Sequence, residues 1–390
     1  MLNIPKVRFK NFSDAWEQRK LGEVAECLDS MRVPINAEER EKIPGNIPYY
    51  GAGNIQGYIN KYLFDEELVL LLEDGDAFDD YLTKSIAQYI TGKTWVNNHA
   101  HVLRPHGHAY FLYSILAHKD IRQWTQLAGA SRKKLVQDAM LNIDIFVPSR
   151  EEQTIIGDCF SNLDNLITLH QRKCDETKEL KKYMLKKMFP RNGEPYPEIR
   201  FEGFSDAWEQ RKLGEVFVEY SEKKHEELPP LTIIQGGGTI LREESDRALQ
   251  YDKSSLSGYK MVKKDDFIVH LRSFEGGLEK ANTDGIISPA YHTFHGDNTD
   301  SSFYYSFFRS RRFIDVLLKP HVYGIRDGKS IDIDGMKSIM IPVPSYEEQK
   351  AIGEYIETLD NLITLHQRKC DDLKEMKQYM LQNMFPQSTR

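Results

Sequence analysis

Cysteine is scarce in this chain of 390 residues, and long apolar runs are missing. The four cysteines form no Cys-x-x-Cys pair, which excludes a disulfide scaffold and favours reduced thiols in a cytoplasmic protein. No run of about 18 apolar residues could span a membrane, and the first residues lack the apolar segment of an export signal. We therefore expect a cytoplasmic protein with no membrane partner.

Signatures of common catalytic sites are also missing. Gly92-Lys93-Thr94 and Gly328-Lys329-Ser330 imitate the end of a phosphate-binding loop, but the glycine required five residues earlier is replaced by Ala87 and Tyr323. His-Glu-x-x-His, Gly-x-Ser-x-Gly and the Pro-Pro tetrad of amino-methyltransferases do not occur. The sequence therefore predicts that the chain is not an enzyme and uses no cofactor.

Two groups of side chains have the composition of a metal site but a simpler interpretation. His99 and His101 alternate as two residues on one face of a strand do. The acidic residues between Glu73 and Asp80 follow the apolar run Leu68–Leu72, as expected for a solvated turn. We predict no metal site.

Cations are outnumbered, with 52 Lys and Arg against 59 Asp and Glu and a net charge of −7. This balance argues against a nucleic-acid partner, because phosphate contacts need clustered cations. Two segments are nevertheless locally basic, since residues 119–134 and 309–329 each carry a net charge of +4. The total charge therefore hides an uneven distribution.

The chain contains an internal repeat. Residues 7–24 and 199–216 are identical at 15 of 18 positions, and residues 151–190 and 347–386 at 27 of 40. The blocks between them, 25–150 and 217–346, share little. A frame that is kept while its inserts differ indicates a fixed scaffold that presents two different recognition modules.

The repeated tails have the pattern of long helices that pair. They are rich in Leu, Lys, Glu, Gln and Met, and their apolar residues alternate in steps of three and four. Ser149 and Ser345 are predicted caps, with Glu152 and Glu348 completing capping boxes. Chain connectivity requires the two helices to run antiparallel. The predicted seam is Ile156, Leu163, Leu166, His170, Leu180 and Met184 in the first helix, and Ile352, Leu359, Leu362, His366, Leu373 and Met380 in the second. The two histidines are interpreted as polar residues that set the register rather than as metal ligands.

This arrangement resembles the specificity subunit of Type I restriction-modification systems. The resemblance is carried by the Trp-Glu-x-x-Lys-Leu-Gly-Glu-Val openings at 16–24 and 208–216, and by Pro-Ser-x-Glu-Glu-Gln at 148–153 and 344–349. The Leu-Asp-Asn-Leu-Ile helices at 163–167 and 359–363 complete it. The twofold pattern spans the whole chain.

The resemblance implies a non-catalytic subunit that recognises double-stranded DNA. Each variable block would be a target recognition domain that reads one half of a bipartite, asymmetric site. The paired helices would set the gap and dock two methyltransferase (modification) subunits, and motor-nuclease (restriction) subunits would join them. The alternative is a coiled-coil adaptor that binds no DNA and presents two protein-binding domains.

Candidate DNA contacts lie in a glycine-led loop at the end of each basic segment. Flexible loops with Ser, Arg and Lys suit close approach to phosphates, and Arg and Asn can also read base edges. The candidates are Ser131, Arg132, Lys133 and Lys134 in the first block and Arg326, Lys329 and Ser330 in the second, with Asn97, Asn98, Arg272 and Ser273 as weaker ones.

The elements expected in the variable blocks predict an α+β fold. Strands are expected at Leu68–Leu72, Trp95–Leu103, Phe267–Leu271 and Ile286–Phe294, and helices at 109–127 and 302–318. We predict two target recognition domains of α/β type, 1–150 and 191–346, separated by an antiparallel two-helix coiled coil made by the conserved spacer helices 151–190 and 347–390.

Overall fold

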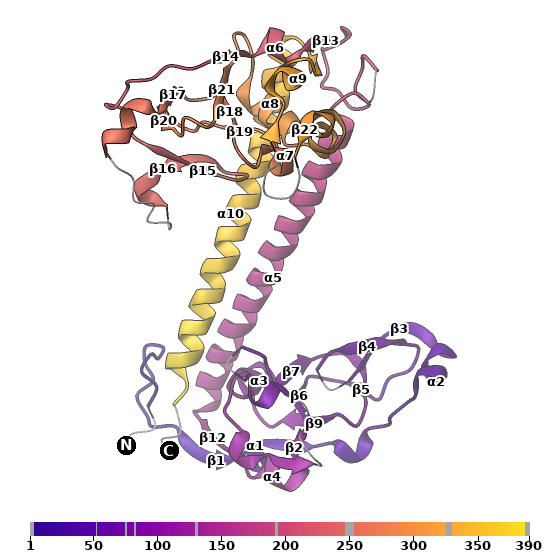
Figure 1. The fold of residues 1–390 in the computed structure, drawn as a ribbon. Coiled ribbons are helices and arrows are strands. Elements are labelled where there is room, and N and C mark those ends of the chain that lie inside the picture. The colour runs from indigo at the N-terminus through magenta and orange to yellow at the C-terminus, as the bar shows by residue number, and fades with distance from the viewer. Residues whose placement is uncertain are drawn as a thin grey trace. The chain divides into compact units, whose positions relative to one another are not determined.

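The fold is described by a computed structural model that covers residues 4–51, 53–74, 76–81, 83–128, 132–191, 194–245, 253–324 and 330–386. The chain divides into two compact units, which we call unit 1 (1–171 and 367–390) and unit 2 (172–366). The helices α5 (Arg150–Lys187) and α10 (Tyr346–Met384) each contribute to both units (Figure 1). The predicted domain boundaries, by contrast, treat each helix as a separate segment.

Unit 1 is built around the four-stranded antiparallel sheet β2-β9-β6-β7. Every residue of β6 is buried, as expected for its unbroken apolar run, and α3 packs against this strand. A second sheet has the order β4-β3-β8-β5. Along the chain the elements are β1 (Glu17–Lys20), α1 (Leu21–Val24), β2 (Ala25–Cys27), η1 (Asp29–Met31), α2 (Ala37–Glu41), β3 (Pro44–Tyr50), β4 (Ile55–Ile59), β5 (Phe64–Asp65), β6 (Leu68–Leu72), η2 (Asp76–Phe78), β7 (Ala87–Ile90), β8 (Lys93–Val96), β9 (Ala100–Pro105), α3 (Ala109–Ala117), η3 (Arg122–Trp124), β10 (Gln126–Ala128), β11 (Arg132–Lys134), α4 (Gln137–Leu141) and β12 (Asp144–Val147).

Unit 2 repeats the central sheet with a different sequence, in the order β14-β21-β18-β19. Its core is rich in phenylalanine, including Phe217, Phe267 and Phe308, whose rings pack edge to face. The elements are β13 (Glu209–Lys212), α6 (Leu213–Val216), β14 (Val218–Tyr220), β15 (Leu231–Ile234), β16 (Gly238–Leu241), η4 (Arg242–Glu244), η5 (Lys253–Gly258), β17 (Lys260–Val262), β18 (Phe267–Val269), α7 (Ser273–Gly276), β19 (Glu279–Lys280), β20 (Gly285–Ile287), β21 (His292–His295), α8 (Ser301–Phe308), η6 (Arg312–Leu318), η7 (Lys319–His321), β22 (Val322–Tyr323), β23 (Ser330–Ile331), α9 (Ile333–Lys337) and β24 (Met340–Val343).

The predicted α+β class, with two α/β-type domains, long antiparallel helices and an internal repeat, is confirmed, but several predicted elements are shorter. The strand expected at Trp95–Leu103 is divided into β8 and β9, because Asn98 and His99 form a turn. The strand expected at Ile286–Phe294 is likewise divided into β20 and β21 around Pro289, which lacks the N–H that a ladder requires. The helix expected at 109–127 ends at Ala117, and the one at 302–318 is divided into α8 and the π-helical segment η6.

In each unit the repeated opening segment pairs with the strand that precedes the long helix. Strand β1 pairs with β12, and β13 pairs with β24, in matching antiparallel registers. In each unit a buried glutamate in the first turn of a long helix accepts two hydrogen bonds from an arginine of the opening segment. The pairs are Arg8–Glu152 and Arg200–Glu348, each with both nitrogen–oxygen distances at 2.7 Å. The repeated opening and the repeated tail are therefore joined by the same contacts in both units.

The helix caps are only partly as predicted. Ser149 and Ser345 do accept a hydrogen bond from the backbone N–H of Glu152 and Glu348, at 3.3 Å in both cases. The glutamate side chains, however, bind the arginines described above. The reciprocal half of the predicted capping box is therefore replaced by a tertiary ion pair.

The helices α5 and α10 pair antiparallel within each unit, as predicted from connectivity (Figure 1). In unit 1 Lys377 pairs with Asp164, and the Cys370 thiol lies 3.9 Å from the Ile167 carbonyl oxygen. In unit 2 Lys181 pairs with Asp360, and the Cys174 thiol lies 3.8 Å from the carbonyl oxygen of Ile363.

The seam differs from the predicted one at three positions. Leu166, Leu180 and Leu362 are 42%, 44% and 39% exposed. Of the other predicted seam residues, Ile156, Leu163, Ile352 and Leu359 are buried, and His170, Met184, His366, Leu373 and Met380 are half-buried. The seam continues through Ile167, Cys174 and Lys181, and in α10 through Ile363, Cys370 and Lys377. This register keeps the alternating steps of three and four residues but admits polar residues that have a partner on the other helix.

Candidate nucleic-acid interface

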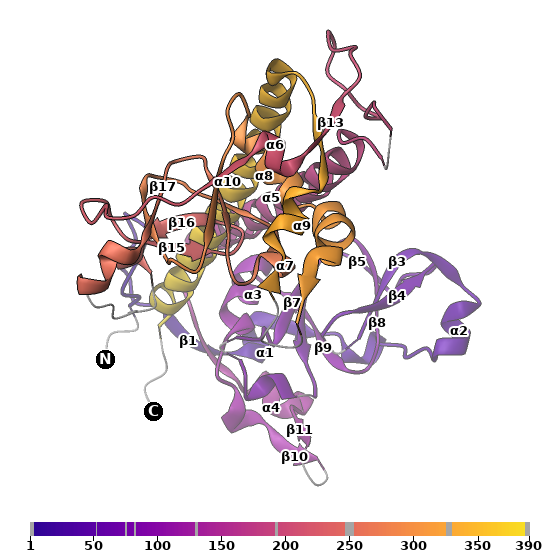
Figure 2. The ribbon, with the colours of Figure 1, turned by 45° about the horizontal axis from the view of Figure 1, so that its top comes forward.

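In each unit the basic hairpin that precedes the repeated tail packs against the turn that follows the central strand. In unit 1 β11 contacts η2, which follows β6. In unit 2 β23 contacts α7, which follows β18. Figure 2 shows the β10–β11 hairpin of unit 1 beside α4. In unit 2 this contact brings together two candidate segments, with Ser273 in α7 and Ser330 in β23. We call these two places the hairpin–turn junctions.

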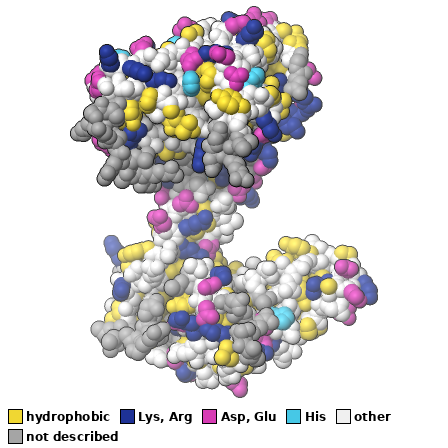
Figure 3. Space-filling model, viewed as in Figure 1, with side chains coloured by type: hydrophobic (Ala, Val, Ile, Leu, Met, Phe, Trp, Pro, Cys, Tyr) yellow, Lys and Arg dark blue, Asp and Glu magenta, His cyan; other side chains and the backbone are white. Residues whose placement is uncertain are grey.

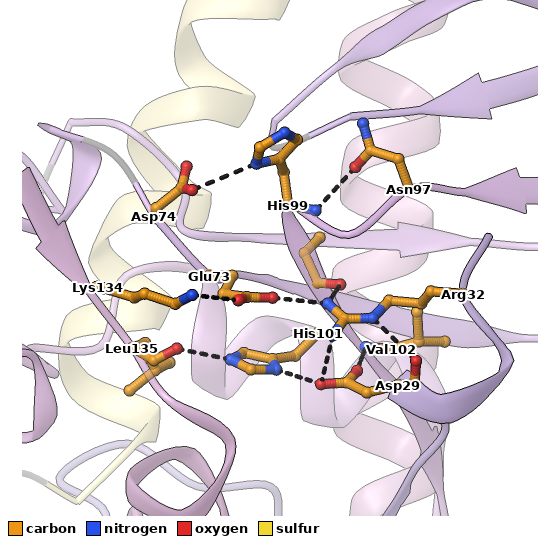
Figure 4. A network of polar contacts seen from close by, with 11 residues as sticks. Asp29, Arg32, Glu73, Asp74, Asn97, His99, His101, Val102, Lys134 and Leu135 are labelled. Carbon is orange, nitrogen blue, oxygen red and sulfur yellow. Dashed lines mark hydrogen bonds and ion pairs between the residues drawn. The ribbon is translucent and has the colours of Figure 1, made fainter. Parts of the chain in front are cut away.

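The junction of unit 1 rests on a buried polar network (Figure 4). His101, which is 1% exposed, places Nδ1 at 2.6 Å from an Asp29 carboxylate oxygen and Nε2 at 2.9 Å from the Leu135 carbonyl oxygen. Arg32 binds Glu73 at 2.7 Å, and Glu73 also pairs with Lys134 of the β10–β11 hairpin at 3.0 Å. The network ties the central sheet to strand β11.

The two lysines of unit 1 that are predicted to contact DNA are paired in the free chain. Lys134 binds Glu73 at 3.0 Å, and Lys133 forms an ion pair with Asp79. The acidic segment interpreted as a solvated turn therefore holds the hairpin. Of Arg132 the structure describes the backbone, which pairs with Ala128. Ser131, by contrast, lies outside the described residues.

Two carboxyl groups of this network have lowered pKa values. Burial by itself raises the pKa of Asp29, but the hydrogen bond from His101 and the charges of His101 and Arg32 outweigh burial and lower it below its usual value. The pKa of Glu73 is lowered in the same way, since hydrogen bonds from Arg32 and Lys134 outweigh burial. The ionised carboxylates therefore stabilise the folded form of unit 1.

Acid is expected to weaken unit 1 through these groups. The pKa values of Asp29 and Glu73 are lower in the folded protein than in the unfolded chain. Their contribution to the free energy of unfolding is therefore present above the unfolded-state pKa values of about 4, and it is lost as the pH falls through the folded-state pKa values. We expect the free energy of unfolding of the wild type to approach that of Asp29→Asn as the pH falls from about 5 to about 3. Urea unfolding of both proteins at several pH values measures this, and a constant difference would contradict it.

The two candidate asparagines of unit 1 differ. Asn97 is 4% exposed, and its Oδ1 accepts from the His99 N–H at 2.9 Å while its Nδ2 lies 3.4 Å from the Gln56 Oε1. It therefore supports the turn between β8 and β9. Asn98 is exposed on that turn and is accessible to a ligand.

The candidate DNA contacts of unit 2 also divide into a buried residue that supports a turn and exposed residues that a ligand can reach. Ser273 is fully buried, and its hydroxyl accepts from the His270 N–H at 2.9 Å. Arg272 is exposed beside it, and Ser330 is exposed at the start of β23. Arg326 and Lys329 lie outside the described residues.

One polar centre of unit 2 was not anticipated from the sequence. The carboxylate of Glu279 is fully buried and accepts from the backbone N–H groups of Gly236 and Gly238, at 2.7 and 3.1 Å. It also accepts from Tyr305 at 2.8 Å and pairs with Arg309. Both glycines have positive φ, so the run of three glycines was the available signal for a tight hairpin. Glu279 fastens that hairpin, β15–β16, to the sheet.

The described residues also bear on metal-ligand groups and on membrane-spanning helices. Within the described ranges, no group of three or more His, Cys, Asp or Glu side chains is placed to hold a metal ion. None of the helices in the described part of the chain is both long and apolar enough to cross a membrane. On the face of the molecule in Figure 3, each unit carries both cationic and anionic side chains.

Comparison with known proteins gives consistent matches. The chain is 38% identical over 142 residues to the type I restriction enzyme specificity subunit S.HindORF215P of Haemophilus influenzae, a match that spans 36% of this chain and only 35% of that protein. It is 22% identical over 404 residues to the type I restriction enzyme MjaVIII specificity subunit of Methanocaldococcus jannaschii, covering 97% of this chain and 94% of that one. The S subunit of a type I restriction-modification system from M. genitalium has a similar fold, with a TM-score of 0.66 at 14% identity over 99% and 100% of the two chains.

A family model provides the broadest assignment. The model described as the type I restriction modification DNA specificity domain matches residues 13–179 and, a second time, residues 205–375. The two matches follow the internal repeat and together cover most of the chain. The chain therefore belongs to the family of type I restriction modification DNA specificity proteins.

Proposed function

We propose that the chain is the DNA-reading subunit of a type I restriction-modification complex and that each unit reads one half of a bipartite, asymmetric site in double-stranded DNA. One observation carries this proposal. The two units share a central sheet and a repeated frame, but their hairpin–turn junctions differ chemically. In unit 1 acidic side chains hold the hairpin lysines, whereas in unit 2 the corresponding turn carries His270 and Arg272.

The proposed contacts use the accessible residues of both junctions. Lys133 and Lys134 are 31% and 42% exposed, so they can exchange their carboxylate partners for phosphates when DNA binds. Asn98 is exposed on the β8–β9 turn of unit 1, and Ser330 is exposed at the start of β23 in unit 2. Because these lysines are neutralised in the free chain, we expect the isolated subunit to bind DNA weakly, with its partners supplying much of the positive surface.

Mapping the methylated positions in a host that carries the assembled system tests this function. We expect a motif with two different half-sites separated by a fixed gap, because the two junctions present different side chains. A palindromic motif would contradict the proposal. A complex that binds no DNA would instead favour the alternative of a protein-binding adaptor.

We further propose that the chain has no catalytic site of its own, that α5 and α10 set the gap, and that they dock two methyltransferase subunits. Apolar side chains remain exposed at repeated helix positions, namely Leu166 and Leu362, Leu180 and Met376, and Tyr183 and Tyr379. Each unit contains one member of each pair. A duplicated apolar face supports two equivalent docking sites for these subunits, which motor-nuclease subunits would join.

Charging the docking face of one unit should halve the number of bound methyltransferase subunits. In unit 1 the double variant Met376→Glu and Tyr379→Glu adds two carboxylates where apolar contact is proposed. Native mass spectrometry should then show one methyltransferase per chain instead of two. Gln378→Glu is the matched control, since Gln378 is exposed about 160° around the same helix from Met376. Retention of two subunits by the double variant would contradict docking at this face.

A further inference from the structure

A tight turn follows the central strand of unit 2 and is fixed by its own hydrogen bonds. The Ser273 N–H donates to the His270 carbonyl oxygen at 3.0 Å, and the His270 N–H donates back to the Ser273 hydroxyl at 2.9 Å. The Arg272 N–H donates to His270 Nδ1 at 3.3 Å. Three hydrogen bonds within four residues hold this turn in one conformation before any ligand arrives.

The turn presents an apolar side chain and a cation to the surface. Leu271 is 66% exposed, and the Arg272 side chain is exposed beside it. The turn forms one wall of a cavity of about 520 Å³, which Ile234 of the β15–β16 hairpin and Tyr291 also line. The acid that lines this cavity is Glu244, and no ion pair joins Arg272 to it or to any other described carboxylate.

The equivalent turn of unit 1 carries a carboxylate that is already paired with two cations. It follows β6 as the His270–Ser273 turn follows β18, and it places Glu73 against Arg32 and Lys134. The Glu73 carboxylate therefore already has partners inside the unit. In unit 2, by contrast, the Arg272 side chain is exposed, and no carboxylate among the described residues pairs with its guanidinium.

We propose that Leu271 and Arg272 are specificity-determining residues of unit 2, with the Arg272 guanidinium reading a guanine edge in the second half-site and Leu271 contacting the neighbouring base. This inference rests on the DNA-reading function proposed above and deepens it. The planar fork of arginine matches O6 and N7 of guanine, the commonest specific contact in the major groove. An adjacent exposed leucine fits the apolar methyl group of thymine, and it gains nothing from a phosphate.

His270 acts as a positioning residue in this arrangement. Its Nδ1 must keep a lone pair to accept the Arg272 N–H, so the ring has to be neutral. Burial, together with the charges of Arg309 and Arg272, lowers the pKa of His270 to about 4, which keeps the ring neutral at the pH of the cell. The turn therefore stays fixed under the conditions in which DNA is bound.

The test uses the complex of the full chain with its methyltransferase subunits and duplexes in which each base pair of the second half-site is varied in turn. Arg272→Ala is expected to reduce discrimination at one base pair by about 5- to 150-fold. Arg272→Lys should lose most of the same discrimination while keeping the salt dependence of binding, because lysine retains the charge but not the fork. Arg311→Ala is the matched control, since Arg311 is another exposed arginine of unit 2.

The outcomes separate the inference from the function on which it rests. An equal loss of affinity for all duplexes, with a smaller salt slope, would make Arg272 a phosphate contact and overturn the inference. Unchanged discrimination in Arg272→Ala would overturn it as well. Failure of the wild-type complex to bind any bipartite duplex would instead refute the proposed function.

The role of His270 is tested by a pair of variants. Asparagine at this position can accept the same N–H in an Asx turn, whereas phenylalanine cannot. We expect His270→Phe to lose discrimination at the base pair read by Arg272 and His270→Asn to keep most of it, with similar affinity for the methyltransferase subunits. Equal discrimination in both variants would exclude a positioning role.

Discussion

Replacing Glu348 with alanine is expected to lower the free energy of unfolding of unit 2 by about 3–5 kcal/mol. The Glu348 side chain is 1% exposed and accepts two hydrogen bonds from Arg200 at 2.7 Å and one from the indole N–H of Trp208 at 3.0 Å. The variant leaves the Arg200 guanidinium, which is only 14% exposed, without its counter-charge. An uncompensated buried charge costs more than the net gain from the pair.

Hydrogen exchange of peptides from β13 and α6 measures this loss for unit 2 alone. A double variant, Arg200→Met with Glu348→Leu, is the control, because apolar side chains of similar size should restore much of the stability. A loss below about 1 kcal/mol in the single variant would show that the pair is not needed for closure.

Unit 1 provides an internal comparison for the same experiment. Glu152 forms the equivalent pair with Arg8, but the indole N–H of Trp16 is buried without a hydrogen-bond partner among the described residues. We therefore expect Glu152→Ala to cost about 1 kcal/mol less than Glu348→Ala, the net contribution of one hydrogen bond.

Truncating Leu163 is expected to destabilise unit 1 by about 2–5 kcal/mol, whereas truncating Leu166 should change its stability by less than about 0.5 kcal/mol. Leu163 is 7% exposed and packs in the cluster that contains Trp16, Phe160 and Met384, while Leu166 is 42% exposed. The two leucines are three residues apart on one helix, so helix propensity affects both equally.

Urea unfolding of Leu163→Ala and Leu166→Ala measures the two losses, and binding of the methyltransferase subunits provides a second readout. Leu166→Ala should weaken binding while leaving the fold intact, because its side chain belongs to the proposed docking face. Equal stability losses in the two variants would contradict a helix register in which Leu163 is buried and Leu166 is exposed.

Sequence patterns alone determined the twofold organisation of this protein. The repeated opening and tail predicted two equivalent frames, and periodicity predicted two long helices whose direction follows from connectivity. These features could be read because they depend on local propensity and on the order of segments along the chain. The buried strand β6 was predicted with its observed bounds for the same reason, since its five residues are uniformly apolar.

The register of the helix pair was decided only by tertiary structure. Leu166 and Ile167 are both apolar, so a step of three or of four residues after Leu163 fits the pattern equally well. Lys181 occupies a seam position because Asp360 of the facing helix binds its ammonium group at 2.6 Å. No periodicity rule anticipates a charged seam residue whose partner lies on the other helix.

The chemistry of the two junctions was likewise settled in three dimensions. Composition marked the hairpin lysines as candidate DNA contacts and Glu73 as part of a solvated turn, yet the fold pairs Glu73 with Lys134 across 61 positions of sequence. In unit 2 the same topology leaves Arg272 exposed on a fixed turn. Charge counted along a chain cannot distinguish these cases, because pairing depends on which distant segments the sheet brings together.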